Sequence, residues 1–320
     1  MKDVVIKRGG MRTSKYWDDF NRRIDETVKV IQNNQKIKIR RVACFITNKC
    51  NFRCKYCNHS ADSVSMNKNT FIKILKLYGN TAIIHITGGE PSVIPWLYPF
   101  IIKNGNKFRF HLNTNAYIKP PSKSIKRLKV SLDSCHENYW NELVGRNAFK
   151  RVILNIKEAS KNTVTSITYT LTKQNYKNAV EFAEFCNKEF PNLYALFFSV
   201  YKGDDKRFVF DTEDVNYFFL NVLPKLLKIL PEESKNLICE TIDEKIRLMK
   251  GVRFKQNCTG GICYLSMSEK IFSPEGNEYT CSHLYRDGIY MSEPNKHDKC
   301  KYGCNRRLVA FNEEVSRRIK

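Results

Sequence analysis

Three cysteines stand close together near residue 50, separated first by three residues and then by two. They are Cys50, Cys54 and Cys57. This spacing lets one short loop turn three sulfur atoms toward a common centre, as thiolates do when they hold an iron–sulfur cluster. The next cysteine is Cys135, so no fourth ligand follows in the same run. A structural zinc site would need that ligand, whereas three local ligands leave one metal position open to a small molecule.

The segments around this loop alternate between apolar runs of strand length and helical patterns. Strands are expected at residues 41–47, 82–87, 107–112, 127–132, 163–171 and 194–200. Helices are expected at residues 71–77, 96–103, 150–160 and 177–189. This order predicts parallel βα units in an α/β fold, a partial (β/α)6 barrel. Parallel barrels carry their chemistry at the C-terminal ends of the strands.

The cysteine loop follows the first expected strand, and Gly88, Gly89 and Glu90 follow the second. Glycines let a backbone approach a ligand without an obstructing Cβ. Glu90 offers a carboxylate that can accept hydrogen bonds from an ammonium group. We therefore expect a binding site where these two strand ends meet.

The cysteine spacing, with Tyr56 just before the last cysteine, resembles the signature of the radical S-adenosylmethionine (radical SAM) superfamily. The resemblance implies a [4Fe–4S] cluster on the three thiols, with the open iron chelated by the amino and carboxylate groups of the cofactor's methionine moiety. It also implies an electron donor of the flavodoxin or ferredoxin kind. Cleavage of the cofactor would then give a 5′-deoxyadenosyl radical.

Further residues match this family at the strand ends. The Gly-Gly-Glu segment would bind the amino group of the cofactor, and polar side chains after the third and fourth strands would approach its ribose or carboxylate. Ala116 stands where relatives usually have glycine, so the turn after the third strand is expected to differ. The expected cofactor-binding residues are Tyr56, Gly88, Gly89, Glu90, Thr114, Asn115, Ser131 and Asp133.

The C-terminal region is rich in cysteine. A pattern of strand, Pro-Glu-Gly-Asn turn and strand predicts a hairpin in this region. Two cysteines precede the hairpin, a third lies at its end, and two more follow it. The hairpin would return the third thiol toward the first two, and four thiolates suffice for a further cluster. The five cysteines are Cys258, Cys263, Cys281, Cys300 and Cys304.

This region resembles the SPASM and Twitch extensions of radical SAM peptide-modifying enzymes, because Cys263, Gly276 and Cys281 have the hallmark spacing. The resemblance implies a small Twitch-like module with one auxiliary [4Fe–4S] cluster. A zinc ribbon on the same cysteines is the alternative. The expected ligands are Cys258, Cys263, Cys281 and Cys304, with Cys300 as the alternative to Cys304.

Four regions follow from these patterns. Residues 1–40 form a basic extension whose helix, at 14–32, leans on the core; residues 41–205 form the barrel. Residues 206–256 are a helical linker with helices at 215–230 and 238–249, and residues 257–320 form the cysteine-rich module.

Composition narrows the setting. The chain of 320 residues is 42% hydrophobic, which permits a sizeable core. No secretory signal or membrane-length apolar run is present, so the cysteines indicate metal ligands or thiols in a reducing cytoplasm. The net charge of +23 favours a polyanionic partner such as RNA, or reflects lysine spread over solvated faces.

Three functional hypotheses follow. The first is a radical SAM enzyme that abstracts hydrogen from a peptide. The second keeps this chemistry but acts on RNA, a nucleotide or a small phosphorylated metabolite. The third is a non-enzymatic zinc-binding protein. No side chain stands out as a general acid or base: Cys44, Cys135, Cys186 and Cys239 are expected to pack as small hydrophobes, and His85 and His111 to be packed or beside the cofactor.

Overall fold

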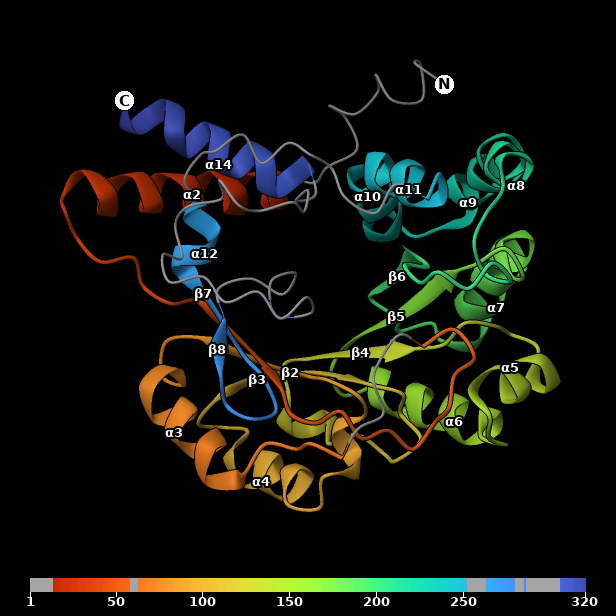
Figure 1. Ribbon diagram of the computed structural model, residues 1–320, viewed down its shortest axis with the longest axis horizontal. Helices are drawn as coiled ribbons and strands as arrows, with labels where there is room; N and C mark the ends of the chain where they lie inside the picture. The colour runs from red at the N-terminus through yellow and green to blue at the C-terminus, as the bar shows by residue number, and fades with distance from the viewer. Residues whose placement is uncertain (1–13, 58–62, 252–262, 280–284, 286–305) are drawn as a thin grey trace.

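The computed structural model describes residues 14–57, 63–251, 263–279, 285 and 306–320 (Figure 1). One sheet runs through it in the order β6-β5-β4-β3-β2-β1-β7-β8. Every neighbouring pair is parallel except the last, in which β8 runs antiparallel to β7. The expected α/β partial barrel with a C-terminal hairpin is confirmed. The strands are β1 Arg41–Phe45, β2 Ile83–Thr87, β3 Arg109–Thr114, β4 Arg127–Ser131, β5 Val164–Leu171, β6 Ala195–Val200, β7 Glu269–Phe272 and β8 Glu278–Tyr279.

Helices between the strands cover one face of this sheet (Figure 1). Alternate strand residues such as Val42, Ile84 and Leu128 point to that face and are fully buried, because successive strand side chains alternate between faces. The opposite, concave face carries the other half of each strand. The connecting helices are α3 Lys68–Tyr78, α4 Leu97–Asn104, α5 Glu137–Val144, α6 Phe149–Ser160 and α7 Ala179–Glu189, with short 3-10 turns η2 Pro91–Val93, η3 Ser122–Ser124 and η4 Tyr176–Asn178.

The linker helices are more divided than expected. The helix expected at 215–230 is split into α8 Thr212–Tyr217, the π-helical turn η5 Phe218–Val222 and α9 Leu223–Ile229. Pro224 lies in the first turn of α9, where its ring tolerates a helix start but not a continuous helix. The helix expected at 238–249 is α10 Glu232–Glu240 and α11 Ile242–Met249. Both α10 and α11 pack against β6, so the linker covers that edge of the sheet.

The N-terminal helix packs on the C-terminal helices. Helix α2 Ser14–Gln32 forms where expected, but its buried face meets α12 Tyr264–Ser268 and α14 Arg306–Ile319. This second core is separate from the barrel core, and Asp25 pairs with Arg318 at its edge. Its buried members are Ile24, Val28, Cys263, Tyr264, Phe311 and Val315.

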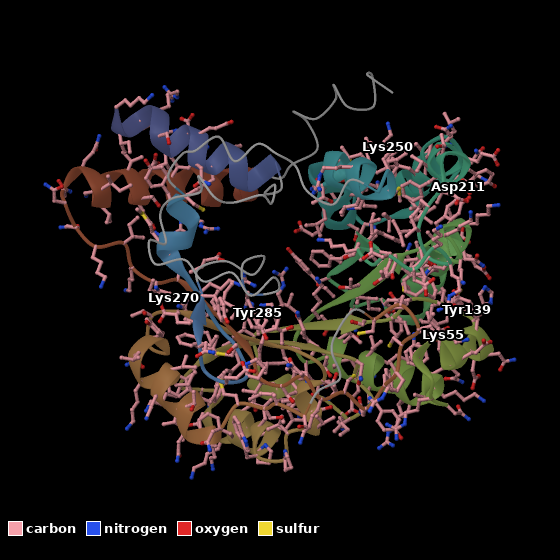
Figure 2. All side chains as sticks on the ribbon, viewed as in Figure 1. Lys55, Tyr139, Asp211, Lys250, Lys270 and Tyr285 are labelled. Carbon is pink, nitrogen blue, oxygen red and sulfur yellow. The ribbon has the colours of Figure 1, made fainter. Side chains whose placement is uncertain are left out.

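The C-terminal hairpin is part of the barrel sheet. Strand β7 pairs with β1 in parallel register, with Ile271 opposite Ala43. Lys270, labelled in Figure 2, pairs with Glu278 across the hairpin at 2.5 Å. Gly276 lies in the turn with φ at 95°, a conformation that glycine adopts readily. Among the described residues, no helix has the length and apolar character needed to cross a bilayer.

The second core gives a stability prediction. Ile24 is fully buried, so Ile24→Ala removes apolar contacts and leaves a cavity. We expect a loss of about 2–4 kcal/mol in unfolding free energy, measured by urea denaturation. Leu154→Ala is the matched control, because Leu154 is 64% exposed. Equal effects of the two substitutions would contradict the packing of α2 on α14.

Candidate metal and cofactor site

The three cysteines after β1 influence one another electrostatically. Cys50 and Cys54 are half-buried and Cys57 is exposed, and all three are thiols rather than half-cystines. Burial raises the pKa of Cys54 strongly, and the charges of Asp133, Cys57 and Cys50 raise it further. Burial also raises the pKa of Cys50, opposed by the Phe52 N–H that donates to its sulfur at 3.4 Å. A bound metal centre would reverse these shifts, because coordinated thiols are deprotonated.

Helix α5, which the sequence reading missed, holds the middle of the cysteine loop. The N–H groups of Arg53 and Lys55 donate to the carbonyls of Val144 and Leu143, both at 2.9 Å. Figure 2 shows Lys55 at α5, where its ammonium pairs with Glu142. The helix ends at Gly145, whose φ of 66° is typical of a glycine C-cap. That glycine, after a segment whose apolar residues Trp140, Leu143 and Val144 have helical spacing, was the available sequence signal.

The two glycines after β2 press against the start of the cysteine loop. A Cβ at Gly88 would lie 2.4 Å from the Thr47 carbonyl oxygen, and one at Gly89 would lie 2.3 Å from that of Lys49. The Gly89 and Glu90 N–H groups donate to the same two carbonyls at 2.7 and 2.8 Å. The close approach expected for a ligand is therefore made here to the protein's own backbone.

The Glu90 carboxylate joins the ends of β2 and β3. It is 1% exposed and accepts hydrogen bonds from the Ser92 N–H at 2.9 Å, the Thr114 hydroxyl at 2.7 Å and the Asn115 N–H at 2.6 Å. Burial raises its pKa, and these three donors oppose that rise. Glu90 and Thr114 thus have protein partners that the motif reading did not anticipate.

Asn115 connects β3 to the cysteine loop. Its side-chain amide donates to the Asn51 side chain at 2.7 Å, and Arg146 donates to the Asn51 carbonyl at 2.9 Å. Ala116, the residue in place of the usual glycine, has a positive φ of 56°. Its N–H donates to the Thr114 hydroxyl at 3.0 Å. Ala116 therefore adopts a left-handed conformation that a non-glycine residue enters only at a cost. Whether the turn differs from that of relatives stays a prediction.

Asp133, two residues after the end of β4, contacts Tyr56 of the cysteine loop. The Tyr56 hydroxyl donates to its carboxylate, and the Thr170 N–H donates at 2.5 Å. Burial raises the pKa of Asp133 to about 6, opposed by the Tyr56 and Thr170 hydrogen bonds. Ser131, the last residue of β4, is exposed. The expected residues of the barrel therefore gather around the C-terminal ends of β1 to β4.

The concave face of the sheet is basic. Strand register and alternation place Arg41, His85, His111, Arg127 and Lys129 on this face. Burial, then Arg127 and Arg41, lower the pKa of Lys129 to about 8. Burial, then Arg127, Arg41 and Arg109, lower that of His111 to about 4. His85 and His111 have ring centroids 6.4 Å apart, so both line this interior as packed side chains.

The auxiliary cysteines lie mostly outside the described residues. Cys258, Cys281, Cys300 and Cys304 are in that group. Cys263 is described: it precedes α12, is 6% exposed and accepts a hydrogen bond from the Asn312 amide at 3.7 Å. Their convergence therefore stays a prediction.

The lone cysteines divide into two pairs. Cys44 and Cys186 are buried as expected. Cys135 and Cys239 are half-buried, and Cys135 lies within 4.8 Å of ligand atoms of His136 and Glu181.

Comparison with known proteins identifies the barrel. Residues 44–186 match the family described as the Radical SAM superfamily. These residues are a radical SAM domain. A probable GTP 3′,8-cyclase from Methanocaldococcus jannaschii is 23% identical over 69% of this chain and 80% of its own length. Another from Sulfolobus acidocaldarius is 24% identical over 44% of this chain and 50% of its own, so the match spans only half of that relative.

Solved structures share the fold of the radical SAM domain and its surroundings. Streptococcus suis SuiB bound to precursor peptide SuiA matches with a TM-score of 0.57 at 17% identity, covering 89% of this chain and 67% of that one. Native anSMEcpe with bound AdoMet and Kp18Cys peptide matches with a TM-score of 0.56 at 17% identity, covering 88% and 84%. At these identities the likeness concerns the fold alone.

Glu90 gives a prediction for the radical SAM domain. Glu90→Gln replaces one acceptor oxygen by an NH2 group that faces N–H or O–H donors in a buried site. We expect a loss of about 1–3 kcal/mol in unfolding free energy by urea denaturation. Glu184→Gln on exposed α7 surface is the control and should change little. An unchanged stability of the Glu90 variant would show that its three hydrogen bonds are not what joins β2 to β3.

His111 gives a pH prediction. Its lowered pKa means that the unfolded chain binds more protons than the folded chain between pH 6.5 and about 4, so stability falls as pH falls through this window. His111→Gln removes this contribution, and its stability should fall less steeply, by at most about 1 kcal/mol per pH unit. Urea midpoints at pH 7 and pH 5 measure the difference. An unchanged slope in His111→Gln would contradict the assignment of this contribution to His111.

Proposed function

We propose that this protein is a radical SAM enzyme whose cluster is held by Cys50, Cys54 and Cys57. The observation that supports this most is the arrangement of the cysteine loop against Gly88, Gly89 and the end of β3 within a radical SAM domain. When bound, the cluster and S-adenosylmethionine supply a 5′-deoxyadenosyl radical by one-electron cleavage of the sulfonium, and this radical takes a hydrogen atom from a substrate.

The donor set fits these groups. Three thiols on one loop match the thiolate ligands of a [4Fe–4S] cluster. Because no fourth cysteine follows in the same loop, one iron of the cluster would be left open to bind the cofactor. Around them, we propose that Tyr56, Ser131 and Asp133 contact the cofactor, and that the Gly88–Glu90 backbone lies beside its amino group. Thr114 and Asn115 would act by orienting Glu90 and Asn51.

A peptide is the first candidate substrate. Among solved structures of similar fold, SuiB is bound to the precursor peptide SuiA and anSMEcpe to a Kp18Cys peptide. The cysteine-rich C-terminal region supports the same candidate through its resemblance to SPASM and Twitch extensions. In this account residues 41–205 form the barrel, residues 206–256 a linker, and residues 257–320 the module that carries the auxiliary cluster.

A nucleotide or another small phosphorylated molecule is the second candidate. It is favoured by the basic concave face of the barrel and by relatives named GTP 3′,8-cyclases. RNA is less well matched to side chains that lie inside a barrel than to an exposed basic surface. For either substrate, we propose that Cys258, Cys263, Cys281 and Cys304, or Cys300 in place of Cys304, bind an auxiliary [4Fe–4S] cluster.

Anaerobic reconstitution tests the proposal. The wild-type chain should hold about eight irons and, with a low-potential reductant, convert S-adenosylmethionine to 5′-deoxyadenosine. Replacing Cys50, Cys54 and Cys57 by alanine should leave about four irons and abolish 5′-deoxyadenosine. Cys44→Ala, a change at a buried cysteine on the helix-covered face of β1, should retain both. Zinc in place of iron, without cofactor cleavage, would instead support a zinc-binding protein.

A further inference from the structure

The basic face of the barrel lacks acidic neighbours over much of its area. Arg41 pairs with Glu269 at 3.2 Å. Among the described residues, neither Arg127 nor Lys129 forms an ion pair with a carboxylate. Arg127 lies over the Tyr194 ring at 4.9 Å, and the Lys129 ammonium lies over the Phe197 ring at 4.6 Å. Lys129 thus faces the interior with an aromatic rather than an anionic partner. Arg127 shares its aromatic partner with a carboxylate, because the Tyr194 side chain is also hydrogen-bonded to Glu233.

Two buried hydroxyls lie on the same face. Ser166 stands opposite Lys129 in the β4–β5 register, and Thr168 stands opposite Ser131. Thr170 is the next residue of β5 on this face, and its N–H donates to the Asp133 carboxylate. The line of residues Ser166, Thr168 and Thr170 therefore runs toward the C-terminal end of β4, where Asp133 lies. Ser166 is 1% exposed, and within the described part of the chain neither its Oγ nor the Thr168 Oγ1 has a hydrogen-bond partner. A buried hydroxyl of this kind costs free energy unless it is hydrogen-bonded.

We propose that this face is a binding site for the phosphate group of a small-molecule substrate, held by Lys129 with the hydroxyls of Ser166 and Thr168. The Lys129 ammonium would donate charge-assisted hydrogen bonds to phosphate oxygens, and the serine and threonine hydroxyls would complete the site. Ser131 and Asp133, at the C-terminal end of β4, separate it from the proposed cofactor. The inference rests on the proposed function only in assigning the bound phosphate to the substrate.

Two features of the surroundings favour an anion. The charges that lower the pKa of Lys129, after burial, are the cations Arg127 and Arg41, so these three groups repel one another. The charged groups that act on the pKa values of His85 and His111 are likewise cationic. Two carboxylates lie near this cluster: Glu269 pairs with Arg41, and Glu233 shares the Tyr194 side chain with Arg127. Among the described residues, Lys129 forms no ion pair with either. A bound phosphate would relieve the repulsion.

Binding of inorganic tripolyphosphate to the reconstituted full-length chain tests the site without turnover. Calorimetry at moderate salt should give saturable binding that Lys129→Met weakens about tenfold or more and Ser166→Ala weakens roughly threefold. Lys126→Met is the matched control, because Lys126 is exposed three residues away and carries the same charge. A urea melt of Lys129→Met should equal or exceed the wild type, since a desolvated charge is removed.

The comparison of ligands separates the sources of the anion. A nucleoside triphosphate that binds more tightly than tripolyphosphate, with the same Lys129 dependence, supports a nucleotide substrate; equal binding supports another phosphorylated molecule. Tri-aspartate that binds more tightly than tripolyphosphate overturns the phosphate assignment in favour of carboxylates. An equal effect of Lys126→Met and Lys129→Met shows diffuse attraction to a basic chain and also overturns it. If the chain cleaves the cofactor but does not bind tripolyphosphate, the phosphate site is overturned and the proposed function stands. If it binds tripolyphosphate but does not cleave the cofactor, the proposed function is overturned and the phosphate site stands.

Discussion

The close contact between two backbones is the constraint on which the site depends. Gly88 and Gly89 run along the carbonyls of Thr47 and Lys49 at distances that leave no room for a Cβ. This contact fixes the cysteine loop at the start, and the α5 carbonyls fix it in the middle. The Asn115–Asn51 hydrogen bond adds a third attachment. A cluster loop must present its sulfurs in one geometry, and these attachments come from three different strand ends or helices.

The hydrogen bonds at these strand ends also give the Gly-Gly-Glu and Thr-Asn motif residues a structural role. Glu90 and Thr114 were expected at a cofactor, yet their polar atoms hold the ends of β2 and β3 together. Such positioning residues act on ligand binding through the loop they orient. Burial of Glu90 makes the network costly to disturb, because a buried carboxylate depends on its donors.

Local patterns were sufficient to predict the barrel strands, their order and the polar residues at their C-terminal ends. Apolar runs and turn residues can be recognised within a few positions of the sequence. The pairing of β7 with β1 and of α2 with α14 was missed, since contacts between distant segments leave no local periodicity. Helix α5 could have been found from Gly145, and the break before α9 from Pro224, because a proline inside a helical pattern ends or kinks the helix. The inward charges of Arg127 and Lys129 follow from strand alternation only once the concave face is known. Part of the +23 charge thus has a defined place inside the barrel.

The central claim is that the three-cysteine loop presents a cluster with an iron open to S-adenosylmethionine. Electron paramagnetic resonance of the reduced, reconstituted protein tests this directly, with spectra taken before and after the cofactor is added. The account predicts a [4Fe–4S]+ signal that changes on cofactor addition and a second signal that does not. A spectrum unaffected by the cofactor, in protein with a full complement of iron, would contradict it.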